Sequence, residues 1–123
     1  MLKVRITNLG AVAILRLEGR MVRGETAQLS EIVDSLSGVS TLVLDFAQLI
    51  TVDAWGLGVL LELRQYAKAK GIDLKLMNVP KLISQVLEIT CLNTVFEVTT
   101  LAEILTLFPP KESVSTMAGA LCA

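Results

Sequence analysis

The chain of 123 residues contains no histidine. Histidine is the most common general base at neutral pH, a frequent metal ligand and the usual partner of a catalytic serine. Its absence argues against an enzyme that depends on any of these roles. The sequence therefore predicts a protein that is not an enzyme and that holds no metal and no cofactor.

Cysteine is scarce as well. The two cysteines, Cys91 and Cys122, lack the CxxC spacing of a zinc or redox motif and are too few for a disulfide framework. This usage fits the reducing cytoplasm. Cys91 stands among apolar residues, which predicts an inert thiol in the core.

An excess of charge of one sign and long hydrophobic runs are also missing. Eleven basic and twelve acidic residues give a net charge of −1, which offers no field for nucleic acid or an anionic membrane. No apolar run approaches the roughly 18 residues that a membrane-spanning helix needs, and the first ten residues are too polar for a signal peptide. We expect no nucleic-acid partner and no membrane association.

The chain is rich in apolar side chains, with 53% hydrophobic residues and a mean hydropathy of +0.65. A chain of this length supports one domain with a single core. The high apolar content predicts strands that are buried on both faces and some surface kept for partners, including a possible homodimer.

Periodic apolar residues divide the chain into alternating strands and helices. The predicted strands cover 3–8, 12–17, 41–46, 72–77 and 95–98. The predicted helices cover 25–36, 54–70, 80–92 and 100–108. This order predicts an α/β fold with a mixed, mostly parallel sheet of about five strands, an antiparallel edge strand and about four flanking helices. We expect one domain over 1–108 and a C-terminal tail over 109–123.

The most informative stretch runs from Asp45 to Leu61. We expect a buried strand to end near Asp45, a short loop to follow, and a helix to begin after Asp53 as its N-cap. The first turn of that helix exposes unpaired N–H groups and the positive end of the helix dipole. Residues 54–56 therefore occupy a position suited to recognition or to a phosphate.

Four segments of the chain together resemble the STAS domain family. They are LVLDF at 42–46, Asp-Ala-Trp-Gly-Leu-Gly at 53–58, and a later pair of segments at 73–79 and 86–98. The resemblance covers about 4–107. It implies a regulatory module like the anti-sigma-factor antagonists, whose partner is an anti-sigma factor or a serine kinase of the GHKL type. The alternative it leaves open is a structural STAS subunit of a lipid-transport ATPase complex or a stressosome-like assembly.

The resemblance breaks at the usual phosphoacceptor. Switchable family members carry Ser or Thr directly before the first glycine of the turn, where this chain has Trp55, preceded by Ala54. Neither side chain has a hydroxyl, so we predict no phosphoacceptor there. Thr51 is a remote alternative, because it precedes the cap and lies outside the reach of the helix N–H groups. A second difference is Arg20, in a segment that often contacts partners in the family.

We predict a partner-binding site on the first two turns of this helix. Its residues are Asp53, Ala54, Trp55, Gly56, Leu57, Gly58 and Val59, together with Arg20. Trp55 has two open interpretations. It can be an interface anchor that shares a helix edge with Val59 and Tyr66, because tryptophan is enriched at binding hot spots, or it can pack into its own core.

Other signals have structural interpretations. Gly56 and Gly58 are a poor dinucleotide fingerprint, because the third glycine is replaced by Leu61. They are expected to let the helix approach the sheet, or a partner approach the helix. Asp45 and Asp53 are expected to satisfy backbone amides rather than to act as a catalytic pair. Three arginines form a loose basic cluster, either a solvated loop or a face for an acidic partner: Arg16, Arg20 and Arg23.

Overall fold

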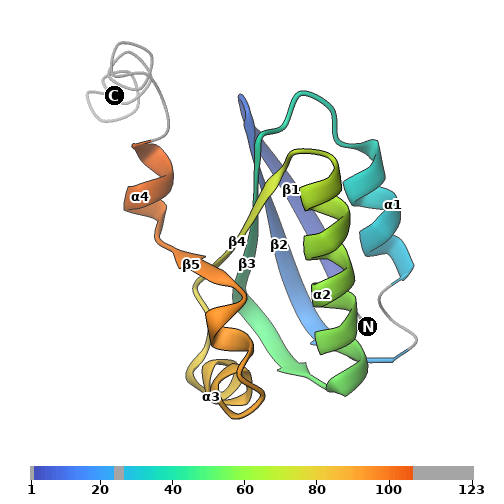
Figure 1. The fold of residues 1–123 in the computed structure, drawn as a ribbon, viewed down its shortest axis with the longest axis vertical. Helices are drawn as coiled ribbons and strands as arrows, with labels where there is room; N and C mark the ends of the chain where they lie inside the picture. Colours follow the sequence, from blue (N-terminus) through green and yellow to red (C-terminus); the bar gives the residue numbers. More distant parts are fainter. Residues whose placement is uncertain (1, 24–26, 107–123) are drawn as a thin grey trace.

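The computed structural model describes residues 2–23 and 27–106 and confirms the predicted α/β fold (Figure 1). One five-stranded sheet has the order β1-β2-β3-β4-β5, with β1 antiparallel to β2 and the other neighbours parallel. The strands are β1 (Lys3–Leu9), β2 (Val12–Met21), β3 (Thr41–Val52), β4 (Asp73–Met77) and β5 (Glu97–Thr99). The helices are α1 (Ala27–Ser35), α2 (Ala54–Ala69), α3 (Lys81–Ile89) and α4 (Leu101–Leu105), with a 3₁₀ turn η1 (Leu92–Thr94).

The antiparallel edge pair is a tight hairpin. Leu9 faces Val12 across the two-residue loop of Gly10 and Ala11. Gly10 has φ +66°, whereas Ala11 keeps a negative φ, as a type II′ turn requires of its two central residues. The carbonyl of Ala11 then accepts the N–H groups of Ser40 and Thr41, which places the start of β3 beside β2.

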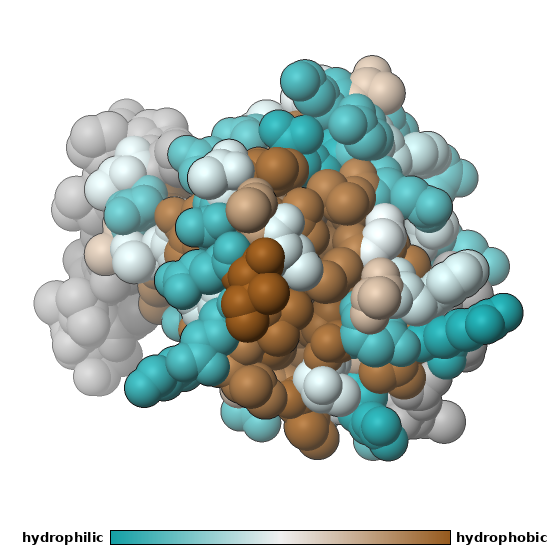
Figure 2. Space-filling model, turned by 60° about the horizontal axis from the view of Figure 1, so that its bottom comes forward, coloured by the Kyte–Doolittle hydropathy of each residue, from teal (hydrophilic) through white to brown (hydrophobic). Residues whose placement is uncertain are grey.

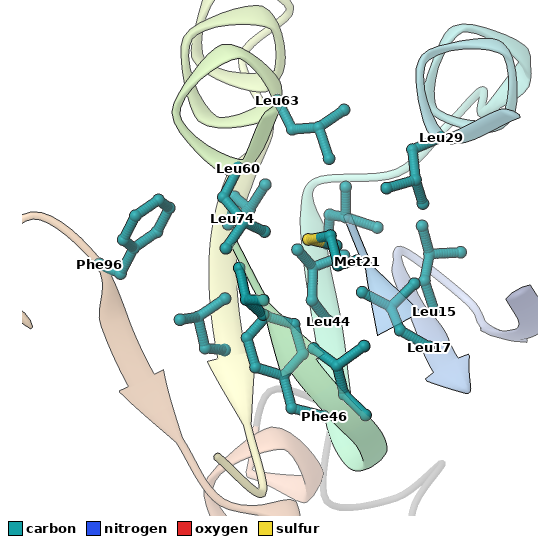
Figure 3. Packing of buried hydrophobic residues seen from close by; sticks show 14 of the residues in the cluster. Leu15, Leu17, Met21, Leu29, Leu44, Phe46, Leu60, Leu63, Leu74 and Phe96 are labelled. Atoms are coloured by element: carbon teal, nitrogen blue, oxygen red, sulfur yellow. The ribbon is translucent and has the colours of Figure 1, made fainter. Parts of the chain in front are cut away.

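The main core lies between the sheet and helices α1, α2 and α3. Leucines from α1 and α2 point toward buried side chains of the sheet, among them Leu15, Leu44 and Phe46 (Figure 3). The helical spacing of Leu60, Leu63 and Ala67 predicts that they share the inward face of α2, and all three are buried. On the opposite face of the sheet a smaller cluster joins three buried strand residues to Ile104 of α4: Val12, Val43 and Met77.

Two predicted strand ends are wrong. β3 does not end near Asp45 but continues to Val52, and β2 passes Gly19 to reach Met21. The two strands stay paired up to Met21 opposite Val52, with two register shifts, whereas the β3–β4 pairing stops at Asp45. The second half of β3 therefore projects beyond β4 as a two-stranded extension with β2.

The third helix is shorter than predicted. It ends at Ile89, Leu92 begins the 3₁₀ turn, and Cys91 between them adopts a left-handed backbone with φ +61°. Cys91 is exposed, so the prediction of a buried thiol is wrong. The left-handed turn points the chain away from the helix axis, and Leu87 and Phe96 fill the core on either side of it.

Two further predictions lie outside the described residues. The predicted start of the first helix at Glu25 falls between the two described segments, and the whole tail from 109 onward follows the second one. None of the helices in 2–23 and 27–106 has both the length and the hydrophobicity needed to cross a bilayer.

Candidate functional site

The site is built where β3 passes directly into α2. Asp53 occupies the N-cap with an extended backbone, and its Oδ1 accepts a hydrogen bond from the Gly56 N–H at 2.8 Å. Its Oδ2 accepts the N–H of Arg23 at 3.3 Å, and its own N–H donates to the Met21 carbonyl at 3.3 Å. The predicted cap is therefore confirmed, and it ties the chain just after β2 to the first turn of α2.

Gly56 is required by close packing. A Cβ at this position would lie 2.1 Å from the carbonyl oxygen of Met21 and 3.0 Å from side-chain carbons of Met21 and Val52. Contacts of 2.1 Å do not occur between such atoms, so any side chain would push the helix off the sheet. The predicted close approach of helix to sheet is confirmed at Gly56.

Gly58 has a different environment. A Cβ built there finds no atom within 4 Å apart from its chain neighbours and the backbone of its own helix. The fold itself therefore gives no steric reason for a glycine at this position. The bare backbone leaves room for something outside the chain to approach the second turn of α2.

Trp55 comes directly before Gly56 and points outward. Its side chain is 52% exposed, so the interpretation of Trp55 as a core residue is wrong. The guanidinium of Arg23 lies 5.3 Å from the centre of the indole ring, within the range of a cation–π contact. The backbone of Arg23 is held by Asp53, so the same residue braces both the cap and the indole.

A hydrophobic area lies at this end of the molecule. Figure 2 turns that end toward the viewer and shows a continuous hydrophobic surface bordered by polar side chains. The end of β3, the start of α2 and helix α3 lie at this end of the molecule, and α3 contacts β3. Ile50 at the end of β3 is 68% exposed, and Leu82 in the first turn of α3 is 60% exposed. We call Ile50, Trp55, Gly58 and Leu82 the tip surface.

Asp45 does not join this site. Its Oδ1 accepts the N–H of Ala47 at 3.0 Å and the side-chain amide of Asn78 at 3.1 Å, so it satisfies a backbone amide as predicted. The extended strand between Asp45 and Val52 spans roughly 20 Å, which keeps Asp45 away from Asp53. Within 2–23 and 27–106, no three acidic or cysteine side chains are placed to hold a metal ion.

The sequence of residues 4–104 matches the family model described as "Mlab, STAS domain". The chain belongs to the STAS domain family. None of the curated protein sequences is significantly similar to it.

Solved structures with the same fold include several anti-sigma factor antagonists. A putative antagonist from Thermotoga maritima has a TM-score of 0.70 and 17% identity, over 84% of this chain and 92% of its own. An antagonist from Mycobacterium paratuberculosis has a TM-score of 0.69 and 19% identity, over 87% of this chain and 93% of its own. SpoIIAA in its unphosphorylated form has a TM-score of 0.61 and 15% identity, over 97% of this chain and 99% of its own. The structure of SpoIIAA from Bacillus is also known in the phosphorylated form.

One further match is to part of a larger protein. The chain spans 19% of the length of the protein Mglu, with a TM-score of 0.57 and 22% identity over 63% of this chain. At these identities the solved structures show the fold alone. That fold is the STAS fold expected from the sequence, with its mixed five-stranded sheet.

The STAS domain presents only some of the residues predicted for its binding site. Ala54 and Trp55 are exposed at the start of α2, and Val59 is half-buried against the core. Gly56 and Leu57 are buried and shape the turn from inside. The exposed Ile50 was missed by sequence reasoning, although the run Ile50-Thr51-Val52 is β-branched throughout, a composition typical of a strand.

The three arginines do not form a loop cluster in this STAS domain. Arg16 and Arg20 lie on β2, opposite Asp45 and Thr51 of β3, and only Arg23 reaches Trp55. Thr51, the remote alternative acceptor, is half-buried within the paired strand β3.

Tyr66 belongs to a contact between α1 and α2 instead of the tip surface. Its hydroxyl donates a hydrogen bond to Asp34, and Lys70 lies 5.2 Å from its ring centre and 3.6 Å from the Asp34 carboxylate. The hydrogen bond from Tyr66, followed by the charge of Lys70, lowers the pKa of Asp34. The same hydrogen bond raises the pKa of Tyr66.

Proposed function

We propose that this STAS domain is a regulatory protein-docking module of the cytoplasm with no enzymatic activity. Its partner is an anti-sigma factor or a serine kinase of the GHKL type, and it docks through the tip surface. The observation that carries this proposal is Trp55, a half-exposed indole on the first turn of a helix whose cap and glycine hold it in place. The anti-sigma factor antagonists that share the fold support this class of partner.

Trp55 has the properties of an interface anchor. Tryptophan side chains combine a large apolar area with few rotatable bonds, and hot spots of about 2 kcal/mol or more are enriched in them. Arg23 limits the orientations of the ring through its contact at 5.3 Å. A side chain that is already ordered loses less entropy when a partner covers it.

The absence of a hydroxyl at the usual acceptor position supports a module without a phosphate switch. Ala54 and Trp55 carry no hydroxyl, and Thr51 is half-buried in a paired strand. A phosphate adds a charge of about −1.5 to −2 and disrupts an apolar interface by repulsion and desolvation. SpoIIAA is known with and without a phosphate, whereas we propose that this module is controlled by its concentration, by self-association and by competition between partners.

Calorimetric titration with purified GHKL-type kinases from the same organism tests the docking proposal. We expect Trp55→Ala to weaken binding by about 30-fold, which corresponds to about 2 kcal/mol. Gly58→Glu should weaken it by a similar factor, because its side chain begins in open space and adds a charge where a partner would approach. Ile89→Ala is the matched control, since it removes an 82% exposed side chain outside the tip surface. Equal binding by all four proteins would contradict the proposal.

Phosphorylation is tested separately by incubating the module with each kinase and ATP. Intact-mass spectrometry should show no added phosphate. A stoichiometric phosphate on Thr51 that also releases the partner would overturn the unswitched mode of control, even if docking through Trp55 were correct.

A structural subunit of an ATPase assembly is the second candidate. The matching family model carries the Mlab description, and the resemblance noted from the sequence includes STAS subunits of lipid-transport complexes. A permanent subunit needs no phosphate switch, which agrees with Trp55 in place of a hydroxyl side chain at the usual acceptor position. Stable co-elution with a purified transport ATPase subunit, combined with no binding to any GHKL-type kinase, would favour this candidate over the first.

A further inference from the structure

Strand β1 is a free edge of the sheet. It is hydrogen-bonded to β2 on one side and has no strand on the other side within the described residues. None of its seven residues is fully buried. A free edge presents unpaired N–H and C=O groups, which are a template for another strand.

The hairpin determines which residues of β1 offer these groups. Leu9 and Val12 flank the two-residue loop and exchange hydrogen bonds with each other. Counting back from Leu9, every second residue of β1 therefore also points its N–H and C=O groups toward β2. The residues between them direct their N–H and C=O to the free edge, and they are Val4, Ile6 and Asn8.

Ile6 is the central residue of this free edge. It lies opposite the fully buried Leu15 on the face of the sheet that the helices cover, yet its own side chain is 45% exposed. A β-branched apolar residue favours strand pairing with a similar residue beside it.

We propose that two copies of the chain pair antiparallel through β1, with a two-fold axis at Ile6. Ile6 of one copy lies opposite Ile6 of the second copy, in a pair that exchanges both hydrogen bonds. Going outward, Arg5 faces Thr7, Val4 faces Asn8 and Lys3 faces Leu9. The pairing joins the two sheets into one, and the helices of both copies lie on the same face.

The charge pattern selects this register. An axis at Arg5 would place two arginines directly opposite each other, which is destabilising, and an axis at Thr7 would leave Lys3 and Val4 unpaired. With the axis at Ile6 the whole strand pairs and no like charges face each other. Arg5 is also neutralised by Glu18 on β2, at 2.6 Å. The strand is therefore complementary to itself.

This dimer goes beyond the proposed docking and does not use the tip surface. β1 runs antiparallel to β2, and the second copy's β1 runs antiparallel to the first, so the two tip surfaces lie at opposite ends of the joined sheet. Both stay free to bind partners.

Analytical ultracentrifugation of the full chain tests the dimer. We expect a species of twice the chain mass of 13.3 kDa. Ile6→Lys places like charges on the axis and should weaken dimerisation at least about tenfold, with an unchanged circular dichroism spectrum. Ile89→Lys is the matched control on α3 and should leave the dimer intact. A wild type that stays monomeric at the highest soluble concentration, or a dimer lost only in Ile89→Lys, would overturn the proposal.

Cysteine cross-linking tests the register. In a background with Cys91→Ser and Cys122→Ser, Ile6→Cys should form a disulfide dimer on mild oxidation, because directly opposed residues have Cα atoms about 5.5 Å apart. Asn8→Cys should not, since two copies of Asn8 are offset by about 13 Å along the strand. Cross-linking through position 8 and not through position 6 would rule out the register with Ile6 on the axis.

Discussion

The inner and outer sides of the first two turns of α2 obey different constraints. On the inner side, Gly56 and Leu60 are buried against the sheet, and a single added carbon at Gly56 would overlap a carbonyl oxygen. On the outer side, Trp55 is half-exposed and Gly58 faces open space. Residues one or two positions apart therefore serve different purposes. The inner side holds the helix in place, and the outer side is available to other molecules.

Gly56→Ala, on the inner side, should cause the largest loss of stability. The added Cβ meets a backbone oxygen that cannot rotate away, so the helix or the end of β2 must shift. Overpacking of this kind costs about 3 kcal/mol. Chemical denaturation should show that loss of unfolding free energy. A loss below about 1 kcal/mol would mean that the end of β2 can move away from the added Cβ at little cost in free energy.

Asp53→Ala tests the N-cap that holds the first turn of α2 against the chain after β2. The substitution removes the acceptor of the Gly56 and Arg23 N–H groups and should cost about 1 to 2 kcal/mol of stability. Asp53→Asn serves as the control, because an asparagine oxygen caps a helix about as well. Equal stability of all three proteins would show that the cap contributes nothing.

Gly58→Ala, on the outer side, should raise the stability of the protein instead of lowering it. Alanine is a better helix former than glycine by about 0.5 to 1 kcal/mol, and its Cβ enters open space. The thermal unfolding midpoint should therefore rise. A destabilised Gly58→Ala variant would mean that the outer side is also constrained by the fold, and it would remove the contrast with Gly56.

The smallest effect is expected far from the tip, at the Asp34–Tyr66 contact. Because the pKa of Asp34 is lowered, its stabilising contribution is present above its unfolded pKa and is lost as the pH falls through the folded value. Because the pKa of Tyr66 is raised, its contribution is lost as the pH rises above about 10. Carbon-detected NMR titration should show the Asp34 pKa moving toward its ordinary value in Tyr66→Phe. An unchanged Asp34 pKa would contradict the assignment.

Much of the fold was predictable from local patterns. The helical spacing of Leu60, Leu63 and Ala67 is enough to identify the inward face of α2, and the short gap between the first two predicted strands is enough to identify the antiparallel edge pair. The extension of β3 was not predicted, because an exposed strand that pairs only with β2 lacks the continuous apolar run that marks a central strand. Cys91 was misplaced because apolar neighbours in sequence do not reveal where a left-handed turn points the chain.

The sequence by itself determined that no hydroxyl stands at positions 54 and 55 and that an aspartate caps the helix, because these are properties of single residues and their spacing. Only the tertiary structure decided that Gly56 is essential and Gly58 free, and that Arg23 lies over Trp55. Those facts depend on the end of β2, about thirty residues away along the chain, being folded back against the first turn of α2. Spacing along one segment carries no information about which distant segment will fill the space beside it.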